Sequence, residues 1–135
     1  MTRKILQPPG WPRPKGYANG IAASGRLVFT AGVVGWTAEE KFEATTLAGQ
    51  FRQALLNTRA ILAEAGAGPQ DIVRMTCYVT DKREYAASQA EIGAAWREIF
   101  GKVFPAMAVV EVKGLVEDAA RVEIETTAVV SEKDE

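Results

Sequence analysis

The chain has 135 residues, of which 47% are hydrophobic and 24% are charged, a composition that indicates one globular domain and excludes a disordered chain. Its 16 basic and 17 acidic residues leave a net charge of −1, which excludes an overall field that would attract nucleic acid or an anionic membrane. The absence of histidine excludes histidine general bases and histidine-ligated metals, and the single cysteine, Cys77, excludes an internal disulfide.

Residues 1–16 form a proline-rich arm, and the whole chain, residues 1–135, is expected to be one domain. The prolines fix the backbone and remove amide donors, so the arm is predicted to be extended and not helical. No apolar run reaches the roughly 18 residues that a membrane span needs, and no apolar core follows the charged start. We expect a cytoplasmic protein that uses neither a membrane nor a nucleic acid as a partner. The prolines of the arm are Pro8, Pro9, Pro12 and Pro14.

Two strands are predicted next, over residues 18–23 and 27–34, and the short polar connection Ser24-Gly25-Arg26 between them is typical of a hairpin. From Leu47 to Glu64 the apolar residues recur at steps of three and four, which predicts an amphipathic helix. Gly66 is expected to end this helix.

The second half of the chain repeats the alternation of strand and helix. Residues 71–80 are predicted to form a strand with Met75, Cys77 and Val79 on one face, where Cys77 is a small buried hydrophobe and not a nucleophile. Residues 81–84 resemble a capping box and open a second helix that runs to about residue 100. Strands over residues 106–112 and 121–130 complete an α+β fold of order ββαβαββ, a mixed sheet with two helices on one face.

The last strand alternates, so Glu123 and Glu125 share the face that the helices leave uncovered. Such a face indicates packing against copies of the same chain, with clefts between the subunits in which a glutamate can position water. The alternative is that both glutamates are ordinary solvated strand residues. Periodicity alone leaves both interpretations open. The other polar residues expected on this face are Tyr17, Thr76, Tyr78 and Glu111.

Several segments together resemble the RidA/YjgF family in order and spacing. This resemblance implies a chorismate-mutase-like fold, a homotrimer with clefts at the subunit interfaces, and hydrolysis of reactive enamines or imines such as 2-aminoacrylate without cofactor or metal. The segments are KGYANG at 15–20, LVFTAG at 27–32, QALLN at 53–57, AEAG at 63–66 with DIVRMT at 71–76, FPA at 104–106 and VEIETTAV at 122–129.

The resemblance also implies roles for individual residues. Tyr17 matches the tyrosine of the family's pocket and would bond the substrate, and Glu123 matches the glutamate that holds the attacking water. Gly32 matches the glycine whose backbone lies against the ligand, and Gln89 matches a polar residue that faces the cleft.

The decisive position departs from the family pattern, and Val109, Gly16 and Asn19 depart as well. The deaminases of the family carry the motif Pro-Ala-Arg, and its arginine binds the substrate carboxylate. In this chain Met107 follows Pro105 and Ala106, and Val109 stands where the family has a cysteine. A carboxylate beside methionine would be an unpaired anion, which costs several kcal/mol when buried.

Two interpretations of Met107 remain. Either a cation from elsewhere (Lys113, Lys15 or Arg13) replaces the guanidinium, or the ligand is a more apolar or aromatic compound that lacks this carboxylate, which we favour. The sequence thus predicts a deaminase for an enamine or imine other than 2-aminoacrylate, or a non-catalytic small-molecule binding protein that uses the same cleft. RNA cleavage is disfavoured, because the chain has no histidine pair or metal site.

Overall fold

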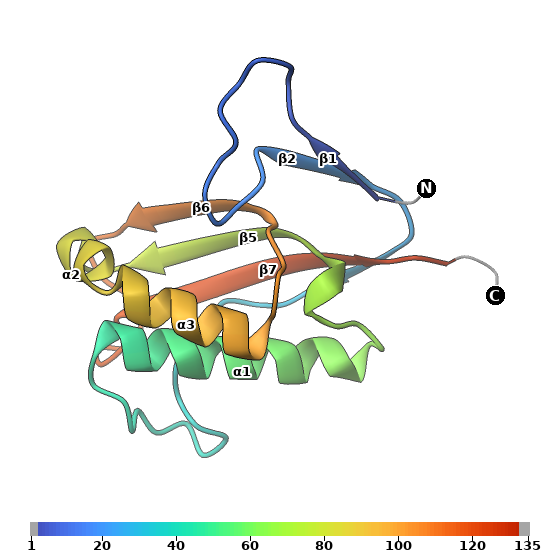
Figure 1. The fold of residues 1–135 in the computed structure, drawn as a ribbon. Helices are drawn as coiled ribbons and strands as arrows, with labels where there is room; N and C mark the ends of the chain where they lie inside the picture. The colour runs from blue at the N-terminus through green and yellow to red at the C-terminus, as the bar shows by residue number, and fades with distance from the viewer. Residues whose placement is uncertain (1–2, 133–135) are drawn as a thin grey trace.

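Helices pack on one face of a mixed β-sheet in the computed structural model, which describes residues 3–132 (Figure 1). The fold class predicted from the sequence is confirmed. The elements, in chain order, are β1 (Arg3–Leu6), β2 (Gly20–Ala23), β3 (Arg26–Phe29), β4 (Val33–Val34), α1 (Leu47–Glu64), a 3-10 turn (Pro69–Asp71), β5 (Ile72–Val79), α2 (Lys82–Ala87), α3 (Gln89–Ile99), β6 (Ala106–Glu111) and β7 (Val122–Val130).

The main sheet has the strand order β3-β7-β5-β6, and β4 pairs with β7 beyond the end of β3. β5 and β6 are parallel, because α2 and α3 carry the chain back across the sheet between them, and the other pairs are antiparallel. The strand β6 therefore lies at an edge of the sheet, next to α3.

The first helix begins and ends where the sequence predicts. The Thr46 side chain accepts a hydrogen bond from the Gly49 amide at 3.1 Å and caps the start of α1. At the other end, Gly66 has φ +72°, and the amides of Gly66 and Ala67 donate to the carbonyls of Ala63 and Leu62. This Schellman arrangement satisfies the last turn of the helix.

The second predicted helix is two helices, and its break lies at Ser88. The Ser88 hydroxyl donates to the Glu84 carbonyl at 2.7 Å, and such a bond competes with the helical backbone pattern. Asp81 caps α2 as predicted, by accepting hydrogen bonds from two amides of its first turn. Glu84 does not complete the capping box, because its carboxylate accepts a hydrogen bond from the Leu47 amide and forms an ion pair with Arg121.

The predicted hairpin near the N-terminus is wrong. β2 pairs with β1 in a separate two-stranded sheet, while β3 pairs with β7 in the main sheet (Figure 1). The expected strand over residues 27–34 is also interrupted, because the Thr30 hydroxyl replaces a backbone group and accepts from the Thr126 amide at 3.1 Å. The strand resumes as β4 two residues after Ala31.

The core lies between the sheet and α1 with α3. Phe51 and Leu55 of α1 are fully buried against Met75 and Cys77 of β5 and Ile124 of β7. No helix within residues 3–132 combines the length and the apolar character that crossing a membrane would require.

Candidate functional site

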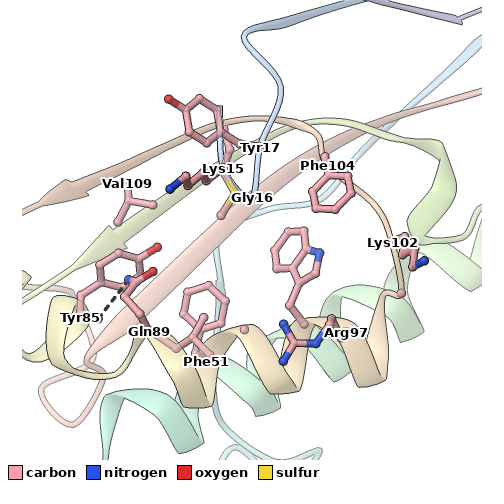
Figure 2. A pocket seen from close by; sticks show the side chains of 15 residues that line it. Lys15, Gly16, Tyr17, Phe51, Tyr85, Gln89, Arg97, Lys102, Phe104 and Val109 are labelled. Carbon is pink, nitrogen blue, oxygen red and sulfur yellow. Dashed lines mark hydrogen bonds between the residues drawn. The ribbon is translucent and has the colours of Figure 1, made fainter. Parts of the chain in front are cut away.

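A cavity of about 600 Å³ lies between α3, β6 and the segment that precedes β2 (Figure 2). Its floor is apolar, because Phe51, Ile92 and Trp96 are buried beneath it and Met107 and Val109 are half-buried beside them. The Trp96 indole is held in place by a hydrogen bond from Nε1 to the Val103 carbonyl at 2.9 Å. The cavity can therefore accommodate a large apolar or aromatic group.

The structure brings together four of the residues predicted from the resemblance. Tyr17, Gln89, Met107 and Val109 all line this cavity. Tyr17 is placed there because the next residue, Ala18, is buried and its amide donates to the Pro105 carbonyl at 3.0 Å, which ties the segment to the start of β6.

Two polar side chains lie at the α2–α3 end of the cavity. Gln89, the first residue of α3, donates from Nε2 to the Tyr85 carbonyl at 3.2 Å (Figure 2). Burial raises the pKa of Tyr85 above its ordinary value and so favours the neutral phenol, and Tyr85 lines the cavity.

The register of the sheet determines where Met107 and Val109 point. Met107 pairs with Met75 and Val109 with Cys77 in the parallel ladder, and paired residues share a face. Since Met75 and Cys77 are buried under the helices, Met107 and Val109 also face the helix layer.

The three cations proposed as substitutes for an arginine at position 107 line three different cavities. Lys15 lines the same cavity as Met107. Arg13 lines a neighbouring hollow that shares Tyr17 with the main cavity. Lys113 lines a different cavity at the far end of the sheet, with Arg121.

Sequence reasoning missed two further cations that line the main cavity, Arg97 and Lys102. Both lie at the C-terminal end of α3 or just after it, where basic residues are common for their interaction with the helix dipole. Their proximity to Met107 follows from the short connection that returns the chain from α3 to β6.

Glu123 and Gly32 lie on the other face of the sheet. Glu123 of β7 points away from the helices, and a Cβ added to Gly32 would lie 2.1 Å from its Oε2 atom. The structure thus brings together these two predicted residues, which are 91 positions apart in the chain. It does not bring them to the cavity that holds Tyr17, Gln89, Met107 and Val109.

The same face carries a second glutamate with a partner. The Tyr78 hydroxyl donates to Glu125 Oε1 at 2.5 Å, and this hydrogen bond raises the pKa of Tyr78 above its ordinary value. Glu125 therefore has a partner that fixes it, whereas the Glu123 carboxylate lies against the open backbone of Gly32.

Cys77 is confirmed as a buried residue, and its burial raises the pKa of its thiol to about 12. Because the thiolate is the reactive form, we predict that iodoacetamide at pH 8.5 leaves Cys77 unmodified in the folded protein and labels it in 6 M guanidinium chloride. Intact-mass spectrometry checks this prediction, and rapid labelling of the folded protein would contradict it.

Acidic residues and Cys77 do not gather into a potential metal site in the described part of the chain: no group of three or more such side chains occurs there. The cavity floor offers thioether and aromatic groups, which do not suit a hard cation.

Comparison with known proteins gives consistent matches over almost the whole chain. The family model described as Endoribonuclease L-PSP matches residues 12–130. A RutC family protein of Synechocystis sp. is 37% identical over 136 residues, which cover 96% of this chain and 98% of the relative. The 2-iminobutanoate/2-iminopropanoate deaminase of Salmonella typhimurium is 34% identical over 113 residues, which cover 84% of this chain and 86% of the enzyme.

Solved structures agree with these matches. A Rid family protein of unknown function from Yersinia pestis, YyfB, superposes with a TM-score of 0.83 at 30% identity, over 96% of this chain and 100% of that one. The YjgF gene product of E. coli gives a TM-score of 0.69 at 32% identity, over 93% of this chain and 98% of the other.

Proposed function

The chain belongs to the RidA/YjgF family, and from this premise we propose that it hydrolyses a reactive enamine or imine other than 2-aminoacrylate. The observation that carries the proposal is Met107, which lines the same cavity as Tyr17 and Gln89 and lies on its apolar floor. The 2-iminobutanoate/2-iminopropanoate deaminase of Salmonella typhimurium supports the reaction class at 34% identity. The thioether supports a different substrate, because it cannot pair with a carboxylate placed at position 107 and favours an apolar group on this part of the floor.

The reaction adds one water to the C=N bond and releases ammonia. An enamine first takes a proton on carbon to become the imine, water then attacks the imine carbon, and the carbinolamine loses ammonia to leave the carbonyl compound. Glu123 is proposed to position the water and accept its proton, and the Tyr17 hydroxyl is proposed to bond the substrate. The two hydrogens that the imine nitrogen gains on leaving as ammonia come from water or solvent, so no oxidant or reductant is required.

The proposed site needs two copies of the chain. Glu123 and Gly32 face away from the cavity of their own chain, so a water on Glu123 can reach a substrate beside Tyr17 only if another copy presents its own sheet face there. The uncovered face supports such an assembly, since Leu27 and Phe29 of β3 are 59% and 67% exposed. We propose the homotrimer of the family, with Glu123 and Gly32 supplied by the neighbouring subunit.

The substitution Met107→Arg tests the substrate assignment. We expect the natural protein to add little to the spontaneous hydrolysis of freshly generated 2-aminoacrylate, and to accelerate hydrolysis of the imine formed from phenylalanine by an amino acid oxidase. Met107→Arg is expected to gain roughly tenfold or more on 2-aminoacrylate, the effect of one charged hydrogen-bonded pair. Ammonia release and the carbonyl product measure both rates.

Met107→Leu is the matched control, because it keeps the volume and the apolar character of the floor and adds no charge. It should retain the preference of the natural protein. Rapid native turnover of 2-aminoacrylate, unchanged in Met107→Arg, would contradict the proposal, because it would show that a substrate without an apolar body is held well in this cavity.

A further inference from the structure

The cavity carries a uniform charge that the apolar floor does not explain. Of the 15 residues that line it within the described chain, three are basic and none is acidic. The basic residues are Lys15, Arg97 and Lys102, which Figure 2 labels around the cavity. All three are exposed, whereas the residues of the floor are buried or half-buried. A cavity with an apolar floor and positively charged residues at its rim is complementary to a ligand that has an apolar body and an anionic group.

None of these three side chains has a partner within residues 3–132. No hydrogen bond or ion pair joins Lys15, Arg97 or Lys102 to a carboxylate there, although α3 carries a satisfied pair in the contact of Glu98 with Arg52 at 2.8 Å. The adjacent residue Glu98 forms its ion pair with Arg52 of α1 and does not line the cavity. The positive rim is therefore not neutralised by the chain itself.

Arg97 is the cation whose position along α3 is best defined. A Cβ built on Gly93 would lie 3.5 Å from Arg97 Nη1, so the guanidinium folds back along α3 and lies over the bare backbone of Gly93. Gly93 also lines the cavity, one turn before Arg97. The guanidinium consequently lies between the two ends of the cavity, which are about 12 Å apart along α3 from Gln89 to Arg97.

We infer that Arg97 binds the anionic group of the substrate, and that the substrate is an aromatic or large branched compound carrying one carboxylate. The apolar body would lie on Phe51, Trp96 and Met107, while the carboxylate meets the guanidinium at the rim. This assignment rests on the proposed function, since it places the ligand in the same cavity. The cation that binds the carboxylate would thus be on α3, at the wall of the cavity, and not at position 107 on its floor.

A binding experiment tests this inference without any turnover. Isothermal titration calorimetry is carried out on the full-length protein with indole-3-acetate, with its neutral analogue indole-3-acetamide, and with acetate, which has the charge and no ring. We expect indole-3-acetate to bind more tightly than either analogue. Arg97→Ala should weaken its binding at least roughly tenfold and should leave the amide unaffected, because only the anion uses the guanidinium.

Two further variants make the result specific. Arg97→Lys keeps the charge and should recover part of the affinity for indole-3-acetate, while Arg83→Ala removes an exposed arginine of α2 that does not line the cavity and should change nothing. Equal affinities of the natural protein and Arg97→Ala for indole-3-acetate would overturn the inference, as would no binding of the anion at millimolar concentration. Binding that depends on Arg97 in a protein that hydrolyses no imine would uphold the inference and refute only the proposed enzymatic activity.

Discussion

Glu123→Gln is expected to lower the rate of imine hydrolysis by roughly 10²- to 10⁴-fold, the usual contribution of a positioned acid–base group. The amide has the shape of the carboxylate but cannot accept a proton from water. Glu123 lies on the uncovered face of β7 in a half-exposed position, so its substitution is expected to change the free energy of unfolding by less than about 0.5 kcal/mol. Ammonia release measures the rate, and thermal unfolding measures the stability.

Glu125→Gln is the matched control for this prediction. It changes the same residue type on the same strand and face, two positions further along, where the carboxylate accepts a hydrogen bond from Tyr78. We expect it to retain turnover within a fewfold of the natural protein. Equal losses in both variants would contradict a specific role for Glu123. A natural protein that binds indole-3-acetate and hydrolyses no imine would instead support the non-catalytic binding protein.

Much of the fold could be predicted because its signals are local. The spacing of apolar residues predicts both ends of α1 as the structure has them, and alternation places Met75 and Cys77 in the core and Glu123 on the open face. Each of these patterns arises within a single helix or strand, because one face of that element packs against the apolar core. Gly66, with φ +72°, is an equally local signal for the end of α1.

The errors concern choices between partners. A short polar turn such as Ser24-Gly25 permits a hairpin, but whether β2 pairs with β3 or with β1 depends on contacts with residues that lie elsewhere in the chain. The break at Ser88 likewise depends on which acceptor its hydroxyl finds, here the Glu84 carbonyl. The conformational propensities of the residues predict neither the partner of β2 nor the acceptor of Ser88, because both outcomes use the same residues.

The candidate site shows the same division. Tyr17, Gln89 and Met107 could be named from the resemblance, and the structure places them around one cavity. Arg97 and Lys102 could not, because a basic residue at the end of a helix is typical of any solvated helix end. The one local signal for Arg97 is the glycine four residues earlier, Gly93, which leaves room for the guanidinium to lie back along α3.

Gly32→Ala is expected to remove turnover by displacing Glu123, while leaving the protein folded. The added Cβ would lie 2.1 Å from Glu123 Oε2 and 2.8 Å from Cδ, so the carboxylate must swing away. The displaced atoms are the far end of a flexible side chain, and the backbone of Gly32 lies outside the positive-φ region, so the stability cost is small. We expect a rate loss of at least roughly tenfold, since misplacing a positioned group by about 1 Å can cost 10²-fold.

A double-mutant cycle decides whether Gly32 acts through Glu123. If the alanine only moves this carboxylate, Gly32→Ala combined with Glu123→Gln should be no slower than Glu123→Gln alone, because the same interaction cannot be lost twice. Gly114→Ala is the control for the substitution itself, since nothing lies within 4 Å of a Cβ added there. Multiplied losses in the double variant would mean that the backbone of Gly32 contributes separately, as a surface against which the ligand lies. Full activity of Gly32→Ala would contradict both roles, because neither the glutamate nor the ligand could then require the space that the missing side chain leaves open.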